Sequence, residues 1–312
     1  SISSFSLAIS SIVLFRSNFQ KISSVLVGYL ETAKYIDYYN KFLAIESKFR
    51  KTGIESIDFS KEDPYTIEFR DVSFRYPGKT DYVLHHFNLI IHNKEKIAIV
   101  GENGAGKSTF VKLLMRLYDP TEGAIYINGV DIKRYDYDQY LSLFAPIFQD
   151  YKLFAFTLEE NITSFDEAPL NSVRVAAKKG GIADRIEQCE YGYDTYITKL
   201  FDENGIEFSG GEQQKIALSR TYFKADAQIT ILDEPTSALD ARAEYQLYQS
   251  FNDLIGDNTA FFISHRLSSA LFCDKILLIR DCGVCEYGSH EELMAQNGYY
   301  SQLFRMQSEY YL

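Results

Sequence analysis

Two short stretches of the sequence carry groups that bind phosphate and divalent cations. The first, IAIVGENGAGKST, runs from an apolar segment through Gly101 and Gly106 to Lys107, Ser108 and Thr109. Glycines let backbone N–H groups curl around phosphate oxygens, and the N-terminus of a following helix adds favourable partial charge. In this G-x-x-x-x-G-K-[ST] pattern the lysine reaches the β- and γ-phosphates, and the serine hydroxyl ligates Mg²⁺. The stretch therefore predicts a site for a nucleoside triphosphate and Mg²⁺.

The second stretch, ITILDEPTSALD, places two adjacent carboxylates directly after an apolar run. Asp233 ends that run, where its carboxylate can hold Mg²⁺ through water, and Glu234 follows immediately. A carboxylate next to the Mg²⁺ carboxylate is placed to orient and deprotonate an attacking water, as phosphoryl transfer to water requires. We therefore expect Glu234 to act as a general base in hydrolysis.

A third stretch, FSGGEQQKIALSR, begins at Phe208 and lies between the first two. Its Ser209, Gly210 and Gly211 precede a helical pattern, an arrangement in which backbone N–H groups at a helix N-terminus bind an anion. Taken alone, the triplet fits an ordinary glycine-rich helix start as well as an anion site.

The three stretches, in this order and at this spacing, resemble the ATP-binding cassette (ABC) family. Ser-Gly-Gly follows the phosphate loop by about a hundred residues, the acidic pair follows by about twenty, and ISHR with His265 comes about thirty later. The resemblance covers about residues 66–300. It implies an ATPase whose cofactors are ATP and Mg²⁺.

The resemblance also implies a role for each matching residue. Tyr76 in VSFRYPG stacks on adenine, although a core residue at a strand end is the alternative for this tyrosine. Gln149 in IFQD contacts Mg²⁺ and the attacking water and relays the nucleotide state to the membrane part, and His265 contacts the γ-phosphate. The implied ATP-binding residues are Tyr76, Gly101, Glu102, Asn103, Gly104, Ala105, Gly106, Lys107, Ser108 and Thr109. The implied catalytic residues are Glu234, His265 and Gln149; the Mg²⁺ ligands are Ser108, Gln149 and Asp233; the D-loop includes Ser237 and Asp240.

In this family Ser209 to Glu212 would be the signature, which binds the ATP held by a second cassette. The resemblance therefore implies a head-to-tail dimer of cassettes. Because this chain has both the acid and the histidine, a homodimer suffices, and a heterodimer with a degenerate partner stays open. The signature reads F-S-G-G-E where L-S-G-G-Q is commonest, so Phe208 and Glu212 depart from the family. We expect the added charge of Glu212 to weaken nucleotide-dependent closure slightly without abolishing it.

Strands and helices alternate around these stretches. TIEFRDVSFRY, YVLHHFNLII and EKIAIV are predicted strands, and GAIYINGVDI is a predicted hairpin with its turn at Asn128-Gly129. A mainly helical stretch follows from about Asp138 to Ala227. The strands ITILD, TAFFISH and KILLIRD come next, with a helix from Ala241, and helices end the chain. This order predicts an α/β fold with a largely parallel sheet. The resemblance adds a RecA-like core, an antiparallel β subdomain and an α-helical signature subdomain, preceded by a long helix.

The first part of the chain differs in character. Residues 1–52 hold one Gly and no Pro, and apolar residues recur there at steps of three and four. This pattern predicts one continuous helix with one apolar face, running to about Lys48 and on the order of 70 Å long. We interpret residues 1–49 as the end of a last transmembrane helix and its cytoplasmic extension, residues 50–65 as a linker, and residues 66–312 as the nucleotide-binding domain. A helix packed on the following domain is the alternative.

Charge and two loops favour the exporter branch of the family. The net charge is −11, and residues 1–60 hold seven basic and five acidic residues, so the body of the chain is acidic. An acidic body argues against a nucleic acid partner, whereas a slightly basic start suits a cytoplasmic membrane flank. FQDYKLFAFTLEENI resembles the stretch after the Q-loop of exporters. FDENGIEFSGG resembles their acidic X-loop, which touches the intracellular ends of transmembrane helices, although Asp202 and Asn204 stand where Gly and Arg are common.

We therefore expect the cytoplasmic ATPase part of a multi-pass protein of the cell (plasma) membrane. It would couple ATP hydrolysis to export of a peptide, drug or lipid. Its partners would be a second cassette, the transmembrane domain of the same polypeptide, the lipid bilayer and the transported substrate. The alternative is a cassette ATPase that acts as a separate soluble subunit or outside transport.

Overall fold

The computed structural model describes residues 2–45, 53, 55–57, 63–148, 150–224, 226–233, 255–264 and 267–309. It divides into two units, Ser1–Lys51 and Thr52–Leu312. Outside the described residues lie Gln149, Glu234, Ser237, Asp240, His265 and the start of the helix predicted from Ala241.

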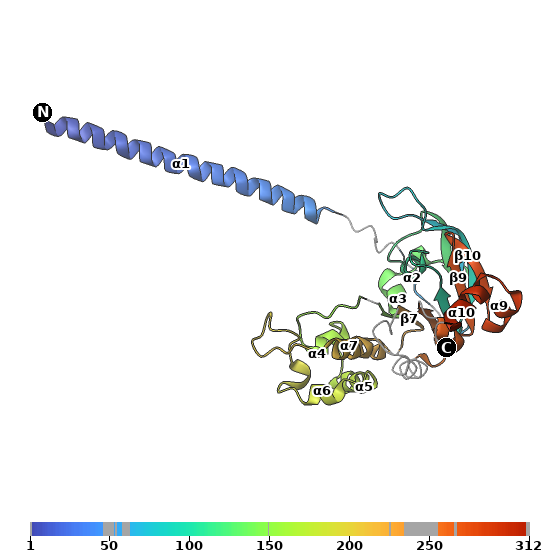
Figure 1. The fold of residues 1–312 in the computed structure, drawn as a ribbon. Helices are drawn as coiled ribbons and strands as arrows, with labels where there is room; N and C mark the ends of the chain where they lie inside the picture. The colour runs from blue at the N-terminus through green and yellow to red at the C-terminus, as the bar shows by residue number, and fades with distance from the viewer. Residues whose placement is uncertain are drawn as a thin grey trace. The chain divides into compact units, whose positions relative to one another are not determined.

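The first unit contains one continuous helix, α1 (Ile2–Leu43), drawn in blue in Figure 1. Its 42 residues extend for about 63 Å at 1.5 Å per residue. The continuous helix is therefore confirmed, but it ends before the predicted Lys48. Its last turn tightens, because the Ile45 N–H donates to the Phe42 carbonyl three residues back.

The prediction of a single apolar face on α1 was wrong. Apolar side chains lie around the helix, because residues between the predicted steps are apolar as well: Leu7, for example, is about 160° around the helix from Ile9. All described side chains of α1 are exposed. None of the helices in the described parts of the chain combines the length and the apolar content that a membrane crossing needs.

The second unit contains a four-stranded antiparallel sheet in the order β2-β1-β4-β5. Its strands are β1 (Thr66–Phe74), β2 (Leu84–His92), β4 (Glu122–Ile127) and β5 (Val130–Asp131). The turn between β4 and β5 has φ of 52° at Asn128 and 77° at Gly129. Two left-handed residues are what a tight two-residue hairpin requires, so the predicted hairpin is confirmed.

A six-stranded sheet forms the centre of the second unit, in the order β10-β9-β3-β8-β7-β6. Its strands are β3 (Lys96–Val100), β6 (Phe144–Ile147), β7 (Ile229–Asp233), β8 (Thr259–Ile263), β9 (Lys275–Arg280) and β10 (Gly283–Gly288). Neighbouring strands are parallel except β10, which is antiparallel to β9. Every residue of β7 and β8 is buried, as expected of strands covered on both faces. The predicted, largely parallel sheet is confirmed.

The sequence did not predict the two edge strands of this sheet. The edge strand β6 contains Pro146, which lacks the N–H that a central strand must donate but is tolerated at an edge. At the other edge, β10 begins at Gly283 and ends at Gly288, and glycine is depleted in strands.

The helix α2 (Lys107–Leu114) joins the two sheets through Phe110. The Phe110 ring is fully buried. It stacks on Phe69 of β1 at 4.7 Å between centroids and contacts Phe87 of β2 at 5.7 Å and Phe261 of β8 at 5.8 Å. One aromatic side chain thus links the helix after the phosphate loop to both sheets.

Four helices form a part of the second unit with its own core. They are α4 (Leu158–Thr163), α5 (Leu170–Lys179), α6 (Ala183–Glu187) and α7 (Gly210–Phe223), which gather together in Figure 1. Buried residues of this core include Leu158, Ile162, Val173, Ile186, Phe208 and Ile216. The antiparallel and helical subdomains implied by the resemblance are therefore both present.

Three further helices lie in the described part of the second unit. They are α3 (Tyr137–Ser142) before β6, and α9 (His290–Gln296) and α10 (Tyr299–Glu309) at the end of the chain, with 3₁₀ turns at Ile132–Arg134, Gly192–Asp194 and Leu267–Phe272. Leu293 of α9 and Tyr300 of α10 pack against Ala98 of β3 and Leu278 of β9. The C-terminal helices thus cover part of the six-stranded sheet.

Candidate nucleotide-binding site

The phosphate loop connects β3 to α2 through residues 101–106, as predicted. Gly101, Gly104 and Gly106 have φ of 150°, 79° and 107°, in the region that favours glycine. A Cβ atom on Gly101 would lie 2.3 Å from the carbonyl oxygen of Ile279 at the end of β9. Only glycine therefore lets the loop pass this close to the neighbouring strand.

The side chain of Lys107, the first residue of α2, reaches back into this loop. Its side chain is buried, and its Nζ donates to the carbonyl oxygens of Gly101 at 2.8 Å and Glu102 at 2.9 Å. Ser108, the next residue, is exposed. The N-cap of α2 is Gly106, which has no side chain to occupy the N–H groups of the first turn. An ammonium group, a hydroxyl group and a helix N-terminus therefore gather at one point, which suits a chain of phosphates.

Asp233 lies at the same edge of the sheet as the phosphate loop. In the register of the parallel strands, Ile99 of β3 and Asp233 of β7 both pair with Ile263 of the strand between them. At the usual strand spacing, the Cα atoms of Ile99 and Asp233 lie about 10 Å apart. The Asp233 carboxylate is buried. A carboxylate and the Ser108 hydroxyl supply the hard oxygen donors that Mg²⁺ prefers, so these residues fit that ion.

Tyr76 lies beside the start of α2. Its hydroxyl is 3.0 Å from Thr109 Oγ1. Its ring packs edge-on against Phe74 at 5.0 Å and Tyr118 at 5.3 Å, and Lys112 Nζ lies 5.8 Å from the ring centroid. The adenine-stacking role stays a prediction, and the packing also accounts for Tyr76 as a half-buried residue at a strand end.

The structure adds an anchor of the phosphate loop that the sequence did not indicate. The Tyr299 hydroxyl of α10 donates to Glu102 Oε1 at 2.6 Å, and the Arg280 guanidinium lies 4.0 Å above the Tyr299 ring. The hydrogen bond to the Glu102 carboxylate raises the pKa of Tyr299. Because Glu102 and Tyr299 are far apart in the chain, no local pattern could pair them.

The predicted signature forms the N-terminus of α7. Ser209 is the N-cap: its Oγ accepts from the Glu212 N–H at 3.4 Å, and Glu212 Oε2 accepts from the Ser209 N–H at 2.8 Å. This is a capping box, in which each residue satisfies a backbone donor of the other. Glu212, one of the two departures from the family, therefore has a local structural role.

Gly210 and Gly211 lie exposed in the first turn of α7. A Cβ atom on either would meet nothing within 4 Å. Glycine costs up to about 1 kcal/mol in a helix relative to alanine, and this cost has no steric reason among the described residues. The two glycines therefore fit a surface that another molecule approaches closely.

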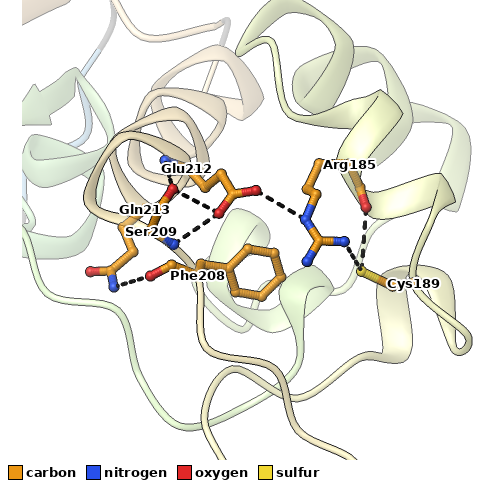
Figure 2. Close-up of polar contacts among 6 residues, drawn as sticks. All are labelled: Arg185, Cys189, Phe208, Ser209, Glu212 and Gln213. Atoms are coloured by element: carbon orange, nitrogen blue, oxygen red, sulfur yellow. Dashed lines mark hydrogen bonds and ion pairs between the residues drawn. The ribbon is translucent and has the colours of Figure 1, made fainter.

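Arg185 of α6 is a residue of this site that the sequence did not indicate (Figure 2). Its Nε donates to Glu212 Oε1 at 2.9 Å, and its guanidinium carbon lies 5.6 Å from the centroid of the buried Phe208 ring. Hydrogen bonds from Ser209, together with Arg185, lower the pKa of Glu212, so this carboxylate stays ionised. Both departures from the family, Phe208 and Glu212, thus contact one arginine.

The glycine loop around Lys107, on parallel strands that also deliver Asp233, defines the second unit as a nucleotide-binding domain of the phosphate-loop class. Residues 84–237 match the family model of the ABC transporter. The chain belongs to the ABC transporter family, and the second unit contains its nucleotide-binding domain.

Two known relatives of the chain are named as a transport ATP-binding protein and an ATP-dependent flippase. It is 36% identical over 296 residues to the subtilin transport ATP-binding protein SpaT of Bacillus subtilis, a match that covers 92% of this chain and 46% of that protein. It is 38% identical over 260 residues to the ATP-dependent lipid A-core flippase of Pectobacterium atrosepticum, covering 83% and 43%.

A solved structure shares the fold. The chain matches a bacterial Atm1-family ABC exporter with ATP bound at a TM-score of 0.76 and 32% identity, covering 88% of this chain and 47% of that one. The chain thus has the nucleotide-binding fold of ABC exporters, and it spans less than half the length of these relatives.

Proposed function

We propose that the chain is the ATP-hydrolysing nucleotide-binding domain of an ABC exporter. Two such cassettes would pair head to tail, and ATP binding and hydrolysis between them would drive export of a peptide, a drug or a lipid. The observation that carries the export role is an exposed aromatic surface on the helical part of the second unit.

This aromatic surface consists of Phe154, Phe156, Phe165 and Phe201. Phe156 contacts Phe165 at 5.2 Å and Phe201 at 6.1 Å between ring centroids, and Phe154 lies 6.1 Å from Phe165. The exposed fractions of the four side chains range from 38% to 66%. Contiguous apolar groups of this kind mark interaction sites. The surface joins the stretch after Gln149 to the X-loop, which supports contact with the intracellular ends of transmembrane helices.

The X-loop holds a defined shape beside this surface. The Asn204 N–H donates to Asp202 Oδ1 at 2.8 Å, and the Gly205 N–H donates to the Asp202 carbonyl oxygen at 3.0 Å. Asp202, which stands where Gly is common, thus stabilises the turn through its side chain. A fixed turn supports transmission of motion to a docked partner better than a mobile one.

The ATP site accounts for the energy supply. Lys107 would exchange its bonds to two loop carbonyls for phosphate oxygens at the N-terminus of α2. Ser108, Asp233 and Gln149 would hold Mg²⁺, which neutralises charge on the β- and γ-phosphates. Glu234 would take the proton of the attacking water, and His265 would contact the γ-phosphate.

The exposed Ser209, Gly210 and Gly211 support a second cassette as partner, in a homodimer or a heterodimer. The proposed domain division is residues 1–49 as the end of a transmembrane helix with its extension, 50–65 as the linker, and 66–312 as the cassette. The cassette would lie on the cytoplasmic side of the plasma membrane, with the membrane domain of the same polypeptide, the bilayer and the transported substrate as further partners.

The proposal is tested on the natural full-length protein in proteoliposomes, with fluorescent peptide, drug and lipid probes. We expect ATP-dependent movement of at least one probe and its loss in Glu234→Gln. The double variant Phe156→Ser/Phe201→Ser should hydrolyse ATP but move at least threefold less probe per ATP, because partner contact is lost. Met306→Ser, at a half-exposed position on α10, is the control.

Two outcomes would contradict this proposal. A natural full-length protein that stays soluble and monodisperse without detergent would favour the soluble-subunit alternative. An unchanged ratio of transport to hydrolysis in the double variant would remove the role of the aromatic surface.

A further inference from the structure

The signature of this chain contains a charge conflict. If it binds the ATP of a second cassette, as proposed above, Glu212 brings a carboxylate into a loop that must receive phosphate oxygens. Like charges in such proximity repel, the more so when water is excluded between the partners. In the structure, the Glu212 carboxylate has partners that offset its charge.

Each oxygen of the Glu212 carboxylate has its own partners (Figure 2). Oε2 accepts from the Ser209 N–H and the Ser209 hydroxyl, both at 2.8 Å. Oε1 accepts from Arg185 Nε at 2.9 Å. The carboxylate is therefore oriented at one end by the N-cap of α7 and neutralised at the other by a guanidinium from α6.

Arg185 is itself held in place. Its guanidinium packs against the Phe208 ring, and its Nη1 lies 3.8 Å from the Cys189 sulfur. Phe208 is buried in the core of the helical part. The arginine side chain is about one-third exposed, so its charge lies at the edge of that core, next to the signature.

We propose that Arg185 is a positioning residue of the signature: it neutralises Glu212 and keeps that carboxylate turned back onto Ser209, so that the first turn of α7 can receive the phosphates of a partner's ATP. This inference rests on the proposed function. It implies that Arg185 is needed only because residue 212 is a glutamate.

That dependence gives a test with four proteins, each made as the full-length polypeptide: wild type, Arg185→Ala, Glu212→Gln and the double variant. Steady-state ATP hydrolysis gives KM and kcat for each. We expect Arg185→Ala to raise the KM for ATP about five- to tenfold, because an unpaired charge faces the phosphates, and to change kcat less than twofold. Glu212→Gln should not raise the KM, and in that background Arg185→Ala should change it less than twofold.

Three further measurements separate positioning from a merely structural role. Arg185→Lys keeps the charge and should restore the KM to within about twofold of wild type. Raising the salt concentration should shrink the KM difference of Arg185→Ala, since screening weakens the repulsion. Arg174→Ala, at an exposed arginine of α5, should leave both constants unchanged. If Arg185→Ala fails to fold, Arg185→Gln, which keeps most of the stem over Phe208, replaces it.

The inference is overturned if Arg185→Ala has the same effect with glutamate and with glutamine at position 212, or if kcat falls as much as KM rises. Failure of the proposed function looks different. In that case the wild type would not hydrolyse ATP, or Lys107→Met would hydrolyse it at the wild-type rate.

Discussion

Replacing Phe110 with alanine tests whether one side chain holds the phosphate-loop helix to both sheets. The ring is fully buried and contacts Phe69, Phe87 and Phe261, which belong to β1, β2 and β8. Removing it leaves a cavity at the junction of the two sheets, three residues after Lys107. The expected result is a large loss of stability centred on the nucleotide site.

The size of the loss follows from the burial. Truncating a fully buried phenylalanine to alanine costs about 3–5 kcal/mol, from lost transfer energy and from the cavity. The stacked contact with Phe69 places Phe110 in the upper half of that range. For a unit of this size, each kcal/mol lowers the melting temperature by about 2–4 °C. We therefore expect Phe110→Ala to melt about 8–20 °C below the wild type.

Scanning calorimetry of the natural full-length protein measures this shift. The unfolding transition of the nucleotide-binding domain is the one whose melting temperature rises when saturating ATP is added. Phe110→Leu, which leaves a smaller cavity, should show less than half of it. Met306→Ala, at a half-exposed position, should melt within 2 °C of the wild type and serves as the control. A Phe110→Ala protein that melts within about 3 °C of the wild type would refute the view that this ring joins the sheets.

Two other predictions concern a lysine and a buried tyrosine. Lys107→Met should bind ATP about 10- to 150-fold more weakly, because a hydrogen bond to a charged group contributes about 1.5–3 kcal/mol. Titration with a fluorescent ATP analogue measures the affinity, and Lys178→Met on the exposed surface of α5 is the control. Binding by Lys107→Met within twofold of the wild type would contradict the prediction. Tyr65 donates to Thr259 Oγ1 at 2.7 Å, so Tyr65→Phe should lower the free energy of unfolding by about 1–2 kcal/mol in urea titrations, and an unchanged midpoint would argue against that bond. Burial raises the pKa of Tyr65 to about 12, so the folded state keeps a proton that the unfolded state loses near pH 10. The stability of the fold that depends on protonated Tyr65 is therefore fully present below pH 10 and is lost as pH rises to about 12. Tyr65→Phe should lack this part of the alkaline loss of stability.

The features that the sequence predicted correctly depend on local chemistry. The turn at Asn128-Gly129 needs two residues that tolerate positive φ, and the loop ending at Lys107 needs glycines followed by a helix. Each requirement is met by residues that are adjacent in the sequence. The helical and antiparallel parts could be expected as well, because members of the family that the sequence resembles have both subdomains.

The features that it missed depend on distant partners or on edges. Arg185 reaches Glu212 from a separate helix, and Tyr299 reaches the phosphate loop from the end of the chain. No spacing rule links such residues before the fold is known. The strand containing Pro146 was hidden because proline is a poor strand residue everywhere except at an edge. The missing apolar face of α1 has the opposite cause, since its apolar residues are too numerous to define one side.

The order of strands in the central sheet has a consequence for how the chain folds as it is made. The strands of the four-stranded sheet all lie between residues 66 and 131 and can pair as soon as that segment has emerged. By contrast, β3 pairs only with β8 and β9, which are synthesised more than 150 residues later. At about 5–20 residues per second, β8 follows β3 after about 8–32 s. During this time β3 has neither strand neighbour and the glycine loop lacks the strand end against which it packs. A ribosome-bound cassette thus acquires its phosphate site only after β8 and β9 have been made, and until then the exposed apolar strand β3 can be bound by chaperones.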